Sequence, residues 1–69
     1  MSTWKDRIEG IIDLIATVEG TDFGAGRARL VEKLGCSMSI MYKWLAGNKP
    51  HTRFKNKLVV IEDEYRGKL

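Results

Sequence analysis

Lysines and arginines are the most numerous of the side chains that can do chemistry in this sequence, and they are distributed unevenly along the chain. Segment 23–57 carries eight lysines and arginines against a single acidic residue, a balance of +7. Residues 1–22 have a balance of −3 and residues 58–69 a balance of −1. Because each phosphate that a cation neutralises releases counterions, this clustering favours a polyphosphate partner. The alternative is a solvated basic surface that has no partner.

Residues suited to catalysis or to metal binding are scarce. The chain has one histidine, His51, and one cysteine, Cys36, and they form no cluster with the spacing of a zinc site. No catalytic triad or pair of carboxylates can be recognised, and Gly24 and Gly26 do not follow a strand as the glycines of a nucleotide-binding fingerprint do. We therefore expect no enzymatic activity, no metal, no cofactor and no small-molecule ligand.

The positions of apolar residues and glycines divide the chain into four expected helices. Helical spacing of apolar side chains predicts helices over about 3–19, 25–34, 37–46 and 52–65. The expected N-caps are Thr3, then Thr21 or Asp22, then Ser37 and Thr52, and the expected stops are Gly20, Gly35 and Gly47. No strand pattern and no repeat interrupts this order.

Four, or at most five, short helices with short connections indicate an all-α fold, a compact bundle that forms one domain over residues 1–69. One apolar stripe per helix is expected to supply the core: Trp4, Ile8, Ile11, Ile15, Leu30, Val31, Leu34, Met41, Trp44, Leu58 and Ile61. The remaining large apolar residues are in surplus and are candidates for a second surface: Ile12, Leu14, Val59, Val60 and Tyr65.

Composition also predicts where the protein acts. Acidic residues near the N-terminus argue against a signal peptide, and Asp13 interrupts the longest apolar run well below membrane-spanning length. A single cysteine cannot form an internal disulfide. We expect a protein of the reducing cytoplasm that makes no contact with a membrane.

Segment 27–50 has the pattern of a helix-turn-helix, in which a second helix is held outward. Gly35 can adopt the left-handed backbone that the tight turn needs, and Cys36 follows it as a small core residue. In the second helix, Met41 is expected to be buried together with Trp44 or Leu45. The side chains between them are expected to face outward: Ser37, Met38, Ser39, Tyr42, Lys43 and Ala46.

The segment LVEKLGCSMSIMYKWLAGNKP resembles the DNA-binding domain of the phage repressor/Cro superfamily, the lambda repressor-like fold. Its matching positions are Leu30, Leu34, Gly35, Ser37, Trp44, Gly47 and Pro50. Cys36 and Met41 replace other apolar residues of that pattern. Val31 stands where alanine is usual, at the close approach of the two helices, and implies a slightly wider packing distance or a shifted angle between them.

The resemblance implies DNA-contacting roles for particular residues. It places Arg27 on the DNA backbone or a base edge. It places the start and outer face of the second helix in the major groove, namely Ser37, Met38, Ser39, Tyr42 and Lys43. Lys43 would bind guanine or a phosphate, and Met38 would pack on a thymine methyl group. Tyr42 would do the same with its ring or bond a phosphate through its hydroxyl. The loop residues Asn48, Lys49, His51 and Arg53 would contact the backbone.

The function that these patterns favour is sequence-specific binding of double-stranded DNA by a small Cro-like repressor of prophage or plasmid type, associated with the nucleoid of a bacterial or phage-infected cell. Because one such motif binds weakly, we expect a homodimer, at least on a palindromic operator. Its interface would involve either the last helix or the first. The alternative is a protein-interaction module of the same shape, such as an antirepressor or an assembly factor, that does not bind DNA.

Overall fold

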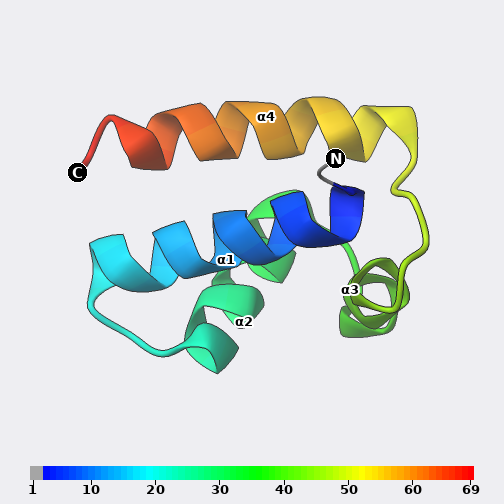
Figure 1. Ribbon diagram of the computed structural model, residues 1–69, viewed down its shortest axis with the longest axis horizontal. Helices are drawn as coiled ribbons and strands as arrows, with labels where there is room; N and C mark the ends of the chain where they lie inside the picture. Colours follow the sequence, from blue (N-terminus) through cyan, green and yellow to red (C-terminus); the bar gives the residue numbers. More distant parts are fainter. Residues whose placement is uncertain (1–2) are drawn as a thin grey trace.

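The computed structural model describes residues 3–69 and consists of four α-helices joined by short turns (Figure 1). These are α1 (Trp4–Glu19), α2 (Phe23–Leu34), α3 (Met38–Leu45) and α4 (Thr52–Arg66). No strand is present between residues 3 and 69. The expected all-α bundle of four short helices is therefore confirmed.

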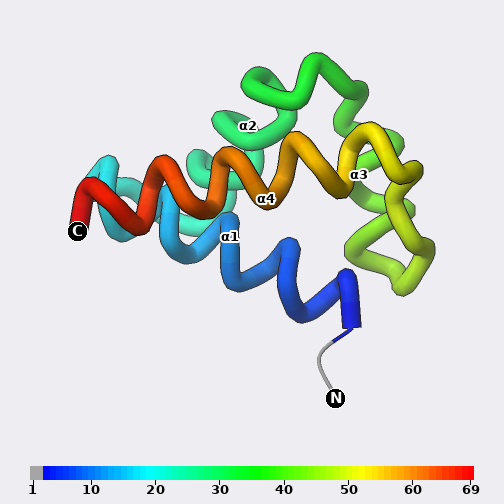
Figure 2. Tube along the Cα trace, turned by 90° about the horizontal axis from the view of Figure 1, so that it is seen from above, coloured from blue at the N-terminus to red at the C-terminus, as the bar shows by residue number. Residues whose placement is uncertain are grey.

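Helix α1 is the centre of the arrangement and contacts each of the other three helices. α1 and α4 lie side by side and run in the same direction, from the end near α3 toward the C-terminus (Figures 1 and 2). α2 packs against α1 and also contacts α3 and α4. α3 lies at one end of the molecule, beside the N-terminal ends of α1 and α4, and the C-terminus lies at the opposite end (Figure 2).

Local capping accounts for the helix starts. The side chains of Thr3 and Ser37 accept hydrogen bonds from backbone amides three residues ahead, at 3.2 Å in both cases, as expected from the sequence. Asp22 caps α2 in the same way, by accepting from the amide of Ala25 at 2.8 Å. This cap starts α2 at Phe23, two residues before the predicted position.

The prediction that Thr52 caps α4 is wrong, because His51 occupies the cap. His51 has an extended backbone and its Nδ1 accepts from the amide of Arg53 at 3.4 Å. Its carbonyl oxygen accepts from the amide of Phe54 at 2.9 Å, so Thr52 already lies in the first turn. An imidazole nitrogen here performs the role that the rule for N-caps assigns to a side-chain oxygen.

The buried core differs from the prediction in two ways: two residues expected inside are only partly buried, and two residues expected in surplus are buried. Trp4 and Val31, expected inside, are only partly buried and pack against the edge of the core. Ile12 and Tyr65, expected in surplus, are 0% and 1% exposed. Ile12 is buried because α1 contacts three helices and so buries more than one apolar stripe. Tyr65 of α4 is buried where its hydroxyl bonds to Glu19 of α1. The remaining buried apolar residues are Ile8, Ile11, Ile15, Ala16, Leu30, Leu34, Met41, Trp44, Leu58 and Ile61.

Gly26 sets the distance between α1 and α2. It is buried, and a Cβ atom added there would lie 2.7 Å from the carbonyl oxygen of Ile12 and 3.2 Å from the Cβ of Ala16. The backbone of α2 therefore packs directly on the backbone of α1 at this point. By contrast, a Cβ added at Gly10 would meet nothing within 4 Å.

A polar network joins the C-terminal ends of α1 and α4. The hydroxyl of Tyr65 donates to Glu19 Oε2 at 2.7 Å, and Nε of Arg29 donates to Glu19 Oε1 at 3.2 Å. The hydrogen bond from Tyr65 lowers the pKa of the Glu19 carboxyl below its usual 4.5, with a further contribution from Arg29. Burial, together with the bond to Glu19, raises the pKa of Tyr65 to about 12.

The contact at Gly26 predicts opposite effects for the same substitution at two helical glycines. Gly26→Ala should destabilise the protein by about 1–3 kcal/mol, because the methyl group overpacks the α1–α2 contact. Gly10→Ala should stabilise it by about 1 kcal/mol, because alanine is the better helix former and the space is open. Urea unfolding followed by circular dichroism measures both. Equal effects of the two substitutions would contradict the close packing of α1 and α2.

The Tyr65–Glu19 pair predicts a stability loss at both extremes of pH. The lowered pKa of Glu19 contributes stability that is present above pH 4.5 and is lost as the pH falls through the folded-state pKa. The raised pKa of Tyr65 contributes stability that is present below its ordinary pKa of 10.0 and is lost as the pH rises toward about 12. Tyr65→Phe should weaken the acid loss and remove this part of the alkaline loss.

Thermal unfolding from pH 3 to pH 12 checks this expectation against a matched variant. Tyr42→Phe makes the same change at a tyrosine that is 53% exposed, and should leave the pH dependence as in the unmodified protein. The coupling of Glu19 to Tyr65 is refuted if Tyr65→Phe and the unmodified protein have the same stability profile across this range.

Candidate nucleic-acid interface

The turn between α2 and α3 is short and is formed by Gly35, Cys36 and Ser37. Gly35 ends α2 with a positive φ of 69°, and its amide donates to the carbonyl of Val31 at 3.0 Å. Cys36 follows, half-buried against the core, and burial raises the pKa of its thiol. Ser37 then caps α3. The turn therefore consists of three residues with distinct tasks, as the sequence pattern predicts.

One face of α3 is buried and fixes the orientation of the other. Met41 is 0% and Trp44 4% exposed, and the Trp44 ring packs on the ring of Phe54 with centroids 5.3 Å apart. The opposite face presents Ser39, Tyr42, Lys43 and Ala46 to solvent, and Ser37 before them is exposed too. These exposures agree with the helix-turn-helix prediction.

Met38 and Ser37 are less available than predicted. The side chain of Met38 is partly buried and packs against the core, so only part of it faces outward. The hydroxyl oxygen of Ser37 is already the acceptor of the helix cap, 3.2 Å from the amide of Ile40. A contact of Ser37 with another molecule would therefore use the O–H donor or the second lone pair of this hydroxyl.

Arg27 of α2 and Tyr42 of α3 form a pair across the two helices. The guanidinium carbon of Arg27 lies 5.1 Å from the centroid of the Tyr42 ring, a cation–π contact. Arg27 is partly buried, and its Nε is buried with no hydrogen-bond partner among the described residues. The two residues are fifteen positions apart on different helices, so no sequence spacing indicates this pairing.

The loop after α3 is fixed at both ends and exposes polar groups between them. Gly47 adopts a φ of 116°, and the amide of Asn48 donates to the carbonyl of Lys43 at 3.1 Å. Pro50 is buried, whereas the predicted contact residues around it are all exposed, namely Asn48, Lys49, His51 and Arg53. Loop and α3 lie at the same end of the molecule (Figure 2).

Ion pairing divides the cations of the molecule into two groups, those with a carboxylate partner and those without one. Five cations pair with carboxylates: Lys5 with Glu9, Arg7 and Arg66 with Glu62, Lys68 with Glu64, and Arg29 with Glu19 and Glu32, all at 3.2–3.8 Å. Among residues 3–69, no such partner lies within 4.0 Å of Arg27, Lys33, Lys43, Lys49, Arg53, Lys55 or Lys57. The unpaired positive charge therefore belongs to α2, α3, the following loop and the first half of α4.

Aromatic rings position three of these cations at the start of α4. Arg53 lies over the ring of Phe54 at 4.9 Å, Lys57 over the same ring at 6.0 Å, and Lys55 over the ring of Trp4 at 5.4 Å. Lys55 is partly buried by this contact. Lys55 and Lys57 therefore lie along aromatic surface.

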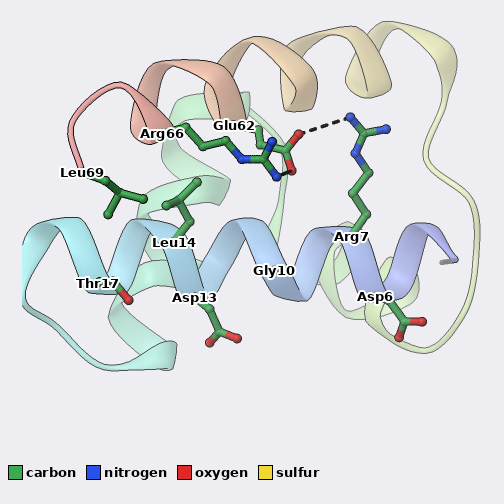
Figure 3. A pocket seen from close by; sticks show the side chains of 9 residues that line it. All are labelled: Asp6, Arg7, Gly10, Asp13, Leu14, Thr17, Glu62, Arg66 and Leu69. Carbon is green, nitrogen blue, oxygen red and sulfur yellow. Dashed lines mark hydrogen bonds and ion pairs between the residues drawn. The ribbon is translucent and has the colours of Figure 1, made fainter.

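A groove lies between α1 and the C-terminal half of α4 (Figure 3). Its charged groups largely satisfy one another, because Glu62 binds Arg7 at 3.3 Å and Arg66 at 3.5 Å. The side chains of Leu14 and Leu69 point toward the same groove (Figure 3). Across residues 3–69, no three His, Cys, Asp or Glu side chains gather as a metal site.

Comparison with known proteins gives no match, since no protein family, no curated protein and no solved structure is significantly similar to this chain. None of the described helices is both long enough and apolar enough to cross a membrane. The interpretation of the site therefore depends on its own geometry and charge.

Proposed function

We propose that this protein binds double-stranded DNA sequence-specifically, as a small repressor-like transcriptional regulator, by inserting α3 into the major groove. The observation that carries the proposal is the coincidence of two features at one end of the molecule. The outward face of α3 is exposed, and the cations around it have no carboxylate partners within the described chain. Unpaired cations beside an exposed helix face are what a phosphate-lined groove requires.

In this proposal some residues position the protein on the DNA, and others contact the base edges and so recognise the sequence. Arg27, Asn48, Lys49, His51 and Arg53 flank α3 and would bind phosphates, which fixes the position of the protein on the duplex. Ser39, Tyr42 and Lys43 occupy the exposed face and would meet the base edges, with Met38 contributing the part of its side chain that is exposed. Lys43 would donate to guanine or, at the groove wall, to a phosphate.

We further propose that two copies bind together on a palindromic site, with their α3 helices about 34 Å apart. One eight-residue helix offers few base contacts, so a second copy supplies the remaining affinity and specificity. Ile12 and Tyr65 are buried and cannot contribute to a dimer interface. The partly or fully exposed apolar residues that remain for it are Leu14, Val59 and Val60.

The proposal predicts a salt-dependent interaction that is lost with one cation of α3. In electrophoretic or fluorescence titrations with duplexes selected from a random pool, affinity should fall steeply between 50 and 200 mM salt. Lys43→Glu should reduce binding at least tenfold and lower the slope of log K against log salt by about 1. Lys68→Glu makes the same charge change at the far end of α4 and should leave binding within about twofold of the unmodified protein, since it lies outside the proposed contact surface.

Two results would contradict the proposal. If the folded protein binds no duplex at low salt, it is not a DNA-binding regulator, and the interaction module of the same shape becomes the better interpretation. If it binds but Lys43→Glu and Lys68→Glu are equivalent, the contact surface is not α3.

A further inference from the structure

The exposed face of α3 offers few groups that can distinguish bases by hydrogen bonds. Lys43 supplies an ammonium group, Ser39 a hydroxyl, and the Ser37 hydroxyl already accepts one hydrogen bond in the cap. The most prominent side chain on this face is instead the ring of Tyr42, which is 53% exposed. In the major groove, the 5-methyl group of thymine is the apolar feature that such a ring can contact.

The ring of Tyr42 is held by Arg27. The guanidinium lies 5.1 Å from the ring centroid, and partial burial of Arg27 restricts its own movement. A side chain already fixed in the free protein loses less conformational entropy when it binds. Because Nε of Arg27 is buried, the terminal nitrogens of the guanidinium are the donors left for another molecule.

We propose, on the basis of the function proposed above, that Arg27 and Tyr42 act as one recognition unit that selects a thymine methyl group in each half-site. The ring of Tyr42 packs against the methyl group. Arg27 is a positioning residue, which holds the ring at the required angle and binds a neighbouring phosphate through its terminal nitrogens. The favoured ligand is thus a duplex with thymine at a fixed position opposite Tyr42.

The direct test replaces thymines of a selected duplex, one at a time, by deoxyuridine, which pairs identically but lacks the methyl group. At the thymine opposite Tyr42, the replacement should weaken binding by about fourfold, the value expected for one buried methyl group. Replacement of thymines outside the contacted half-sites is the matched control and should leave the affinity unchanged.

Variants of Tyr42 and Arg27 test whether this pair distinguishes thymine from deoxyuridine. Tyr42→Phe keeps the ring and should keep the thymine-to-deoxyuridine ratio, whereas Tyr42→Ala should bring it close to 1. Arg27→Ala should also lower the ratio, although Arg27 itself does not touch the methyl group, and Arg27→Lys should restore part of it. Lys49→Ala should weaken binding to both duplexes equally and leave the ratio as it was.

The possible outcomes separate this inference from the function on which it rests. If the protein binds duplexes but no deoxyuridine replacement matters, the methyl readout is refuted and DNA binding stands. A ratio that persists in Tyr42→Ala assigns the readout to another side chain and refutes the unit. A ratio unaffected by Arg27→Ala refutes the positioning role of Arg27. If no duplex is bound at low salt, both proposals fail together.

Discussion

The backbone contact between α1 and α2 at Gly26 is the constraint on which the rest of the structure depends. A Cβ at this position would lie 2.7 Å from the carbonyl oxygen of Ile12, so no larger residue fits without moving one helix. With α2 seated directly on α1, the short turn at Gly35 determines where α3 begins. The buried pair Met41 and Trp44 then determines which face of α3 points outward. The exposed face of α3 is thus a consequence of packing on α1.

The distribution of charge also differs between two regions, α1 with the C-terminal half of α4 and the surroundings of α3. Near α1 and the C-terminal half of α4, carboxylates and cations pair with one another, and Glu62 alone binds two arginines. Around α3 the cations lie over aromatic rings or extend into solvent. Exposed pairs contribute little to stability. Their consequence here is that the cations of α1 and of the C-terminal half of α4 are neutralised, whereas those of α3, its flanking loop and the start of α4 are left without carboxylate partners, which would orient a polyanion toward α3.

Local features of the fold could be predicted from the sequence, because they depend on neighbouring residues. Ser37 caps a helix and Gly35 forms a turn, as their residue types favour. The four helices could be predicted from local sequence in the same way. What could not be predicted depends on tertiary neighbours. Ile12 is buried rather than exposed because α1 has three partners. The cap at His51 is a local exception, which was not predicted because an imidazole nitrogen and not a side-chain oxygen accepts from the amide of Arg53. The site shows the same limit, since nothing local indicates that Arg27 reaches Tyr42.

The central claim is that a nucleic-acid duplex contacts the end of the molecule formed by α3 and its flanking loop. The most direct measurement is a titration of the isotopically labelled protein with a selected duplex, followed by backbone amide chemical shifts. The account predicts that the changes concentrate at Arg27, at residues 37–46 and at the loop 47–53, while Gly10, Asp13 and Thr17 along the α1–α4 groove remain unchanged. Changes confined to that groove, with α3 unaffected, would contradict it.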